Sequence, residues 1–407
     1  MASSRTVVIA GAGIGGLTAA LTLARRGFRV AVHEAAERLE ETGAGIQLSP
    51  NAARILIALG LGERLEPHVV VPQEIKVMTA HSGRVLARAP LGAAAKARYG
   101  APYWVIHRGD LQTALRAAVA ATPDIALHLG SRVEDFAVHD SGVTVLTHCG
   151  GQTIEEHGIA LVGADGLWST LRGRLGHRAL PRFARHTAWR SLVPAQAVPL
   201  ELSAPAVNLW LGSKAHLVHY PVKAGGMINV VAIRREDSNA PDSYASSSRE
   251  PGWSAPGDGA EILARFPAGV WQAPVRALLG AAEQWQTWAL YDRAPLRHWG
   301  KGPVTLLGDA AHPMLPYLAQ GAAMAIEDAA VLADCIARTP DDADGAMRVY
   351  ERTRRARTAR TQRAARRNGT VYHLGGAAAV LRTLALTAMG GQRLIRRYDW
   401  LYGWTPA

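Results

Sequence analysis

Residues 6–34 read TVVIAGAGIGGLTAALTLARRGFRVAVHE, and this segment decides the fold of the first part of the chain. The β-branched run 6–10 is typical of a short buried strand in a parallel sheet. A helix-forming run follows the glycines at 17–26, and residues 28–33 predict a second strand with Glu34 at its carboxyl end. Strand, GxGxxG, helix, strand and acid in this order predict a Rossmann-like dinucleotide-binding unit.

Each residue of the glycine turn has a mechanical reason. Gly11 permits the tight turn, Gly13 lets the backbone approach a pyrophosphate, and Gly16 allows close helix–strand packing. The helix that begins near Ile14 offers free N–H groups to the phosphates. Glu34 can accept a hydrogen bond from a ribose 2′-OH, which disfavours NADP at this site. The alternative is a glycine-rich turn without a ligand.

Length and composition bound the remaining possibilities. The 407 residues are 48% hydrophobic and 19% charged, which predicts two or three domains with a large core. Cys149 and Cys335 alone cannot form a disulfide framework or a cysteine-based zinc site, so we expect no metal and a reducing, cytoplasmic location. No signal peptide is expected. The longest apolar candidate for a membrane helix, 375–390, is interrupted by Arg382 and is expected to pack on its own domain.

The net charge of +12 is concentrated in one segment. Eight arginines lie within 352–367 with no acid between them. They predict a solvated helix, because at helical spacing they surround the axis and leave no clean apolar stripe. A nucleic-acid partner is not expected, since neither a recognised binding module nor stacking aromatic residues accompany the arginines.

Three later motifs each join an apolar run to a turn or a helix. They are VIHRGDLQ (105–112), IALVGADGLWSTLR (159–172) and VTLLGDAAHP (304–313), the last followed by a helix-forming run (321–332). Asp165 and Asp309 follow buried strands, which is where α/β sheets bind ligands. The alternative is that both aspartates cap the helices that follow them.

With these motifs the chain resembles the class A flavoprotein monooxygenases of the para-hydroxybenzoate hydroxylase type. It is most similar to the branch of salicylate hydroxylase, 3-hydroxybenzoate 6-hydroxylase and 6-hydroxynicotinate 3-monooxygenase. The segments that carry this branch resemblance are GAGIQLSPN (43–51), GDAAHPM (308–314), AQGAAMAIED (319–328) and DWLYG (399–403). The resemblance implies an α/β fold in which a Rossmann-like FAD-binding domain carries an inserted antiparallel-sheet substrate domain and a C-terminal helical region.

The resemblance also implies a role for each motif residue. Glu34 would bind the FAD ribose, and Arg108 and Gln112 would hold the cofactor from the second helix. Asp165 would serve FAD and the passing nicotinamide, Asp309 the ribityl chain, and Pro313 would lie beside the flavin ring. The amides of Gly321, Ala322 and Ala323 would point at the pyrimidine edge of the flavin, where a helix N-terminus stabilises negative charge.

We expect the domains to interleave along the chain. The FAD-binding domain is expected in three parts, the substrate domain in two, and a helical region at the end. The expected ranges are 1–75, 101–175 and 296–350 for FAD binding, 76–100 and 176–295 for the substrate domain, and 351–407 for the helical region. Within the middle of the chain, residues 238–256 predict a mobile loop because they are rich in Ser, Pro and Gly.

Candidate catalytic residues lie in the middle of the chain. Runs 206–211, 216–221 and 227–233 predict an antiparallel sheet. His216 and Tyr220 share one strand face, and His219 has the opposite parity.

The branch has a His-x-x-x-Tyr pair that matches His216 and Tyr220, and either residue can remove a phenolic proton. The alternative is that both are ordinary sheet residues. Tyr317 is the next candidate for the catalytic base. Tyr317 and Gln47 depart from the pattern of the hydroxynicotinate enzymes and disfavour 6-hydroxynicotinate as substrate.

The resemblance implies a monooxygenase that hydroxylates a small phenolic or hydroxylated aromatic acid. NAD(P)H would act as a transient co-substrate that reduces FAD, and O₂ would form a flavin C4a-hydroperoxide. The alternatives are a non-aromatic or polycyclic substrate, or a non-catalytic FAD-binding protein. Expected partners are the small aromatic substrate and O₂, with the protein a monomer or homodimer, and peripheral membrane contact limited to the C-terminal region.

Overall fold

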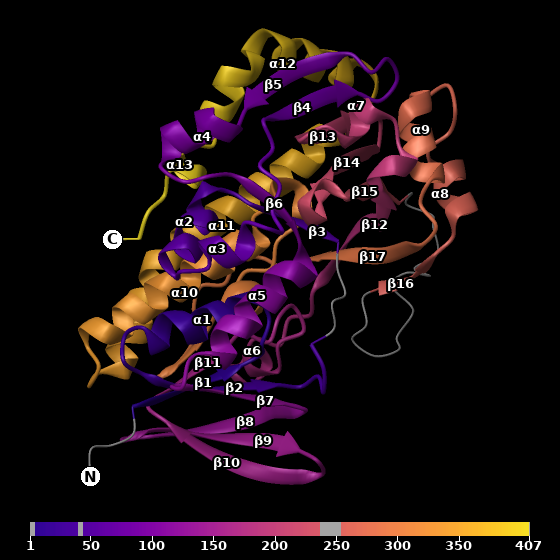
Figure 1. Cartoon of the computed structure of the whole chain (residues 1–407). Helices are drawn as coiled ribbons and strands as arrows, with labels where there is room; N and C mark the ends of the chain where they lie inside the picture. The colour runs from indigo at the N-terminus through magenta and orange to yellow at the C-terminus, as the bar shows by residue number, and fades with distance from the viewer. Residues whose placement is uncertain (1–4, 40–43, 237–253, 407) are drawn as a thin grey trace.

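The computed structural model describes residues 5–39, 44–236 and 254–406. A parallel sheet at the base of the molecule has the strand order β18-β11-β1-β2-β7 (Figure 1). Its strands are β1 (Thr6–Ala10), β2 (Arg29–Glu34), β7 (Ile125–Leu129), β11 (Ala160–Gly163) and β18 (Val304–Leu306). The Rossmann-like unit predicted from the first glycine motif is therefore confirmed.

Helices cover this sheet, and an antiparallel hairpin sheet adjoins it. Helix α1 (Ile14–Ala24) packs against α10 (Gly321–Arg338) and α5 (Arg108–Ala120). Strands β8 (Ser131–His139), β9 (Gly142–Cys149) and β10 (Gln152–Gly158) form the hairpin sheet. The remaining elements of this half are β3 (Gly45–Leu48), α2 (Pro50–Ala58), α3 (Gly62–Leu65), α4 (Gly92–Tyr99), β6 (Trp104–His107) and α6 (Thr170–Arg174).

A second sheet of eight strands has the order β16-β17-β12-β15-β14-β13-β4-β5. Its strands are β4 (Glu74–Thr79), β5 (Val85–Pro90), β12 (Arg182–Pro194), β13 (Ala206–Leu211), β14 (Ala215–Val222), β15 (Met227–Arg235), β16 (Ser254–Gly257) and β17 (Trp285–Asp292). The three predicted strands pair antiparallel as expected, but β13 pairs with β4 in parallel, because β4 joins from a distant part of the chain. The predicted loop 238–256 lies outside the described residues except for its last three positions, which are in β16.

The outer face of the second sheet and the connections carry short helices. They are α7 (Leu200–Ser203), α8 (Gly259–Arg265) and α9 (Ala273–Gly280), together with the 3₁₀ turns η4 (Gly308–Ala310) and η5 (Pro316–Leu318). Buried side chains from α8 and α9 pack on this face with residues of β12, β14 and β15, in one cluster that includes Trp189 and Leu217. The opposite face of this sheet, which includes Tyr220 and Val222, packs with Met324 of α10.

Three helices end the chain. The long helix α11 (Ala343–Tyr372) crosses α10, α12 (Gly376–Arg396) packs on β5, and α13 (Asp399–Tyr402) follows (Figure 1). Helix α12 thus packs on its own protein as expected, although it leaves Val380, Leu381 and Leu384 exposed. Within the described ranges no single helix is long and apolar enough to cross a bilayer, and only α11 together with the segment Gly376–Tyr402, bent by 114°, meets that test.

The prediction that the arginines of residues 352–367 are solvated is wrong for Arg354, and Arg357 and Arg366 also form ion pairs. Arg354 on α11 is fully buried between two fully buried acids of α10, with Nη1 2.7 Å from Glu327 and Nε 2.6 Å from Asp328. Arg357 also pairs with Glu327, at 2.6 Å, and Arg366 pairs with the last residue of β17. The acids that neutralise these arginines come from elements distant in sequence, so the local pattern of residues 352–367 did not reveal them.

The buried ion cluster, meaning Glu327, Asp328, Arg354 and Arg357, also holds three distant segments together. Asn51 donates to Glu327 at 2.6 Å, and Arg357 donates to the backbone carbonyls of residues 400 and 401 at 2.8 and 2.9 Å. The segments 43–51, 319–328 and 399–403, which carry the family resemblance, are therefore neighbours in space. Residue 43 itself lies outside the described part of the chain.

We predict that Arg354→Ala destabilises the protein strongly. Removal of one partner leaves two buried carboxylates with less compensation, which costs about 3–5 kcal/mol of unfolding free energy. The matched control is Arg363→Ala, an exposed position on the same helix, which should stay within about 0.5 kcal/mol of the wild type. Urea unfolding of both variants measures the difference, and equal stabilities would contradict a structural role for the cluster.

Candidate functional site

The glycine turn after β1 has the geometry that its motif requires. Gly11 has φ +105°, and a Cβ there would lie 2.5 Å from the carbonyl oxygen of Ala164. A Cβ on Gly16 would lie 1.9 Å from the carbonyl oxygen of Gly11. Gly13 differs, because a Cβ there would meet no atom within 4 Å. The first two glycines are thus required by the packing of the turn, whereas Gly13 opens onto free space.

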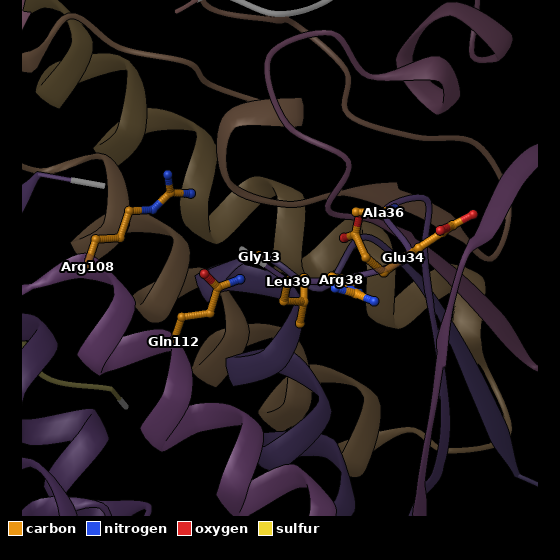
Figure 2. A pocket seen from close by; sticks show the side chains of 8 residues that line it. Gly13, Glu34, Ala36, Arg38, Leu39, Arg108 and Gln112 are labelled. Carbon is orange, nitrogen blue, oxygen red and sulfur yellow. The ribbon is translucent and has the colours of Figure 1, made fainter. Parts of the chain in front are cut away.

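That free space is a cavity of about 600 Å³ at the carboxyl end of the parallel strands. Four of the predicted cofactor residues line it together: Gly13, Glu34, Arg108 and Gln112. Figure 2 shows Arg108 and Gln112 extending from neighbouring turns of α5, with Glu34 on the other side of Gly13. Phosphates and a ribose could thus be held between a helix N-terminus, an arginine and a carboxylate.

The Glu34 carboxylate is held in place by two backbone donors. Its Oε2 accepts a hydrogen bond from the amide of Ala12 at 2.7 Å, and its Oε1 accepts one from the amide of Ala36 at 3.0 Å. Each carboxylate oxygen keeps a further lone pair. The orientation is therefore set before any ligand arrives, and acceptor capacity remains for a ribose hydroxyl.

Asp309 lies in η4, which follows β18, and is not among the residues that line this cavity. Among the described residues its partly buried carboxylate accepts no hydrogen bond, and burial raises its pKa although His312 and Arg108 oppose the shift. Its Oδ1 is 3.9 Å from where a Cβ of Gly321 would stand, so it faces the first turn of α10. The free amides of residues 321–323 are thus beside an unpartnered acceptor, and this arrangement suits a polyol chain.

The two oxygens of Asp165 differ in their hydrogen bonding: one caps a helix and the other has no partner among the described residues. Its Oδ2 accepts from the amide of Leu171 at 3.1 Å and so caps the start of α6. Its Oδ1 is buried and has no partner among the described residues. Burial raises the pKa of this carboxyl. Arg172, one residue beyond Leu171, donates to the carbonyl of Ala310 at 3.0 Å and ties this motif to the loop of Asp309.

Pro313 and His312 follow on that loop, and the buried ion cluster holds the loop from below. His312 Nε2 lies 2.5 Å from Asp328, which also accepts from the amide of Gly308 at 3.1 Å. Burial would raise the pKa of Asp328, but the charges of His312 and Arg354 lower it to about 2. The loop is therefore anchored to an ionised acid. The carbonyl of Pro313 accepts from a glutamine of α11.

The predicted catalytic residues occupy two ends of one sheet face. His216 and Tyr220 point to the same side of β14, and four residues of strand separate them by about 13 Å. The Tyr317 ring lies 5.5 Å from that of His216. Tyr220 packs instead beside Gly45, where a Cβ would lie 2.6 Å from the tyrosine ring. The structure thus brings His216 and Tyr317 together but not His216 and Tyr220, while His219 stacks on Trp210 on the other face.

Three residues that sequence reasoning missed join this face. His373 and His186 form a hydrogen-bonded row with His216, and Arg190 of β12 lies near Tyr220. His373 comes from the end of α11, 157 residues away from His216. No local pattern marks any of the three.

Comparison with known proteins gives consistent results. Residues 4–365 match the FAD binding domain family. A 3-hydroxybenzoate 6-hydroxylase of Aquipseudomonas alcaligenes is 40% identical over 398 residues, which cover 98% of this chain and 97% of the relative. A 3-amino-4-hydroxybenzoate 2-monooxygenase of Streptomyces platensis is 40% identical over 405 residues, which cover 98% and 96%.

Among solved structures, Klebsiella pneumoniae HpxO complexed with FAD and uric acid superposes with a TM-score of 0.84 at 26% identity. That match covers 99% of this chain and 97% of the other. The residues described above fit FAD, because Gly13 opens onto the cavity beside Glu34, and Arg108 of the same cavity is close enough to Asp309 to lower its pKa.

We predict that Asp309→Ala weakens FAD binding about 10- to 100-fold, the equivalent of a lost charge-assisted hydrogen bond. The apoprotein should not unfold earlier, because the carboxylate has no described partner to lose. Fluorescence titration of apoprotein with FAD and a thermal melt measure the two quantities. Unchanged FAD affinity with an earlier melt would show that Asp309 only stabilises the fold.

Proposed function

This chain belongs to the FAD binding domain family and is an FAD-dependent monooxygenase, and we propose that it hydroxylates a small aromatic acid that already carries a ring hydroxyl group. NAD(P)H serves as the electron donor. The relatives named above act on 3-hydroxybenzoate and 3-amino-4-hydroxybenzoate, both of which are phenols with a carboxylate. The closest chemical class common to these names is a hydroxylated benzoate.

The observation that supports this proposal is the contact between two parts of the structure. One is the face of the second sheet that carries His216, Tyr220 and Arg190, and the other is the loop that follows Asp309. Tyr317, four residues beyond Pro313, packs with Ala188 and Ile233 of that face and meets the His216 ring. Further along, Tyr220 packs with Leu318 and Met324, which flank the start of α10. A ring held between this loop and β14 would thus lie beside the flavin end of the cofactor site.

Arg190 supports an acidic substrate. Its guanidinium lies over the Trp288 ring at 4.9 Å and makes no ion pair with any acid of the described residues. Its Nε is buried without a hydrogen-bond partner, and burial lowers its pKa. A partly desolvated arginine without a partner is favourable for a carboxylate ligand, which it can bind through two parallel hydrogen bonds. Arg190 is therefore our candidate for the substrate carboxylate.

The remaining chemistry follows from groups near the ring. Bound FAD supplies the reducing equivalents that activate O₂ for transfer of one oxygen atom. His216 accepts the phenolic proton at Nε2, because a phenolate ring is richer in electrons and reacts faster with an electrophile. The free amides at the start of α10 would stabilise negative charge on a bound flavin. Tyr317 and Tyr220 orient the substrate at the two ends.

We predict that NAD(P)H oxidation is stimulated by hydroxybenzoates and coupled to hydroxylated product. Arg190→Met should raise KM for 3-hydroxybenzoate at least about 10-fold, as expected for a lost charge-assisted contact. KM for 3-methylphenol, which has no carboxylate, should change little. Product analysis with both compounds measures this. Equal effects on the KM values of both compounds would show that Arg190 does not recognise the carboxylate. Absence of product from the wild type with every phenol would reject the proposed function.

We further predict that Tyr220→Phe and His216→Ala separate flavin reduction from oxygen transfer. Both variants should retain FAD, because neither residue lies in the cofactor cavity. NAD(P)H oxidation should continue, while product per NAD(P)H falls and hydrogen peroxide makes up the balance. For His216→Ala the hydroxylation step should slow about 10²–10⁴-fold. The control is His219→Gln on the opposite face of β14, and full coupling in both test variants would show that the pair is structural.

A further inference from the structure

Three histidine rings form a continuous row that leads away from the candidate substrate site. His216 Nδ1 lies 2.7 Å from His373 Nε2, and His373 Nδ1 lies 3.0 Å from His186 Nε2. The rings come from β14, the residue after α11 and β12, so the row crosses three elements. Both N···N distances are those of hydrogen bonds between nitrogens of neighbouring imidazoles.

The row runs from the interior toward the surface. The exposed fraction of the residue rises from 2% at His216 to 9% at His373, and His186 is partly exposed. At the inner end, His216 Nε2 has no hydrogen-bond partner among the described residues, and its ring faces Tyr317. The row thus has one open acceptor at the site and one ring near solvent.

An irregularity of β12 places the outer ring. The pairing of β12 with β17 shifts register between Phe183 and Thr187, and Arg185 within this bulge has φ +56°. A bulge re-aims the side chains next to it and is common beside active sites. His186 therefore points into the row because the strand is locally distorted, which is a cost that regular pairing would have avoided.

On the basis of the proposed function, we propose that His216, His373 and His186 form a proton relay that carries the substrate's phenolic proton to solvent. His216 Nε2 takes the proton from the phenol oxygen, and the O–H bond breaks as the N–H bond forms. His216 then passes its Nδ1 proton to His373 Nε2, and His373 passes its own Nδ1 proton to His186 Nε2.

The relay ends when His186 loses its Nδ1 proton to water. Because Nδ1 of His186 is covered in this structure, the ring must turn toward the surface for this last transfer. One proton leaves the phenol, one proton reaches water, and no electrons are moved. Each ring ends with its hydrogen on Nε2 in place of Nδ1, so the rings return to their first tautomer before the next turnover.

The surroundings favour passage of the proton over storage. Burial lowers the pKa of all three rings, and neighbouring histidines add to the lowering at His216 and His373, so that the pKa of His373 falls to about 3. The charged groups near the row are Arg235 and Arg382 beside His373, and Arg235 and Glu236 beside His186, while tyrosine rings 317 and 372 face His216.

Only one of these neighbours is an acid, and Glu236 is already paired with Arg265 at 3.1 Å. A cation on the row therefore has little compensation, and the resting rings are neutral. A buried neutral histidine is a weak base by itself. Connection to solvent lets His216 pass the proton onward, so that no ring of the row has to hold a positive charge.

The test measures proton release directly. FAD-loaded oxidised enzyme is mixed with 3-hydroxybenzoate in weak buffer in a stopped-flow instrument, and a pH indicator reports the proton set free when the phenol ionises. His373→Gln should slow this release at least about 100-fold. FAD retention, the melting temperature and the dissociation constant of the substrate should stay near their wild-type values.

His186→Ala supplies the measurement that a packing role would not affect. The release should slow and should then recover as free imidazole is added, because the partly exposed position leaves room for the small base. His219→Gln, on the other face of β14, should release the proton at the wild-type rate and show no response to imidazole.

Two results would overturn the relay, and they are distinguishable. Wild-type proton release and full coupling in His373→Gln, with no imidazole response in His186→Ala, would show that the row is structural while the hydroxylase function stands. Absence of hydroxylated product from the wild type with every hydroxybenzoate would reject the proposed function, and the relay with it.

Discussion

The placement of the Arg354 guanidinium between two fully buried acids is the constraint on which the site depends. Charges at this depth are tolerated only with partners, so α10 and α11 cannot shift past one another without exposing an uncompensated ion. Asp328, held by this arginine, in turn fixes His312 and the amide of Gly308, and so the loop that presents Asp309. Stability and cofactor geometry therefore rest on the same few contacts.

Several charged side chains around the candidate site lack a hydrogen-bond or ion-pair partner that a ligand could supply. Asp309 and one oxygen of Asp165 lack hydrogen-bond donors among the described residues, whereas Arg190 lacks an acid. An unpaired buried polar group costs free energy, and a bound ligand that pairs with it recovers that cost. The two aspartates follow strands β11 and β18 of the parallel sheet, whereas Arg190 lies on β12 of the second sheet. The unsatisfied groups thus lie both on the sheet proposed for the cofactor and on the sheet proposed for the substrate.

The opposing sheet face combines rigidity with neutral proton carriers. Its three histidines are hydrogen-bonded in a row, of which His216 and His373 are buried, and burial lowers the pKa of each ring. Most of the neighbours of the row are aromatic rings or cations. We propose that such a row passes a proton along without storing it on any one ring. The pairing of β12 with β17 shifts register at the bulge that aims His186 into the row. Local strain and buried histidines are thus found together beside the candidate site.

The sequence by itself determined the local structure. The glycine turn, its strand and helix, the motif residues Glu34, Arg108 and Asp309, and the shared face of His216 and Tyr220 all follow from backbone sterics and from helix and strand periodicity, which act within a few residues. Only the tertiary structure decided which charges are buried and which rings meet. Arg354 looked solvated because its acids lie on α10, and His216 meets His373 because α11 ends beside β14. Ion pairs and hydrogen-bonded rows depend on distance in space, and a single sequence does not record contacts between segments that the fold alone brings together.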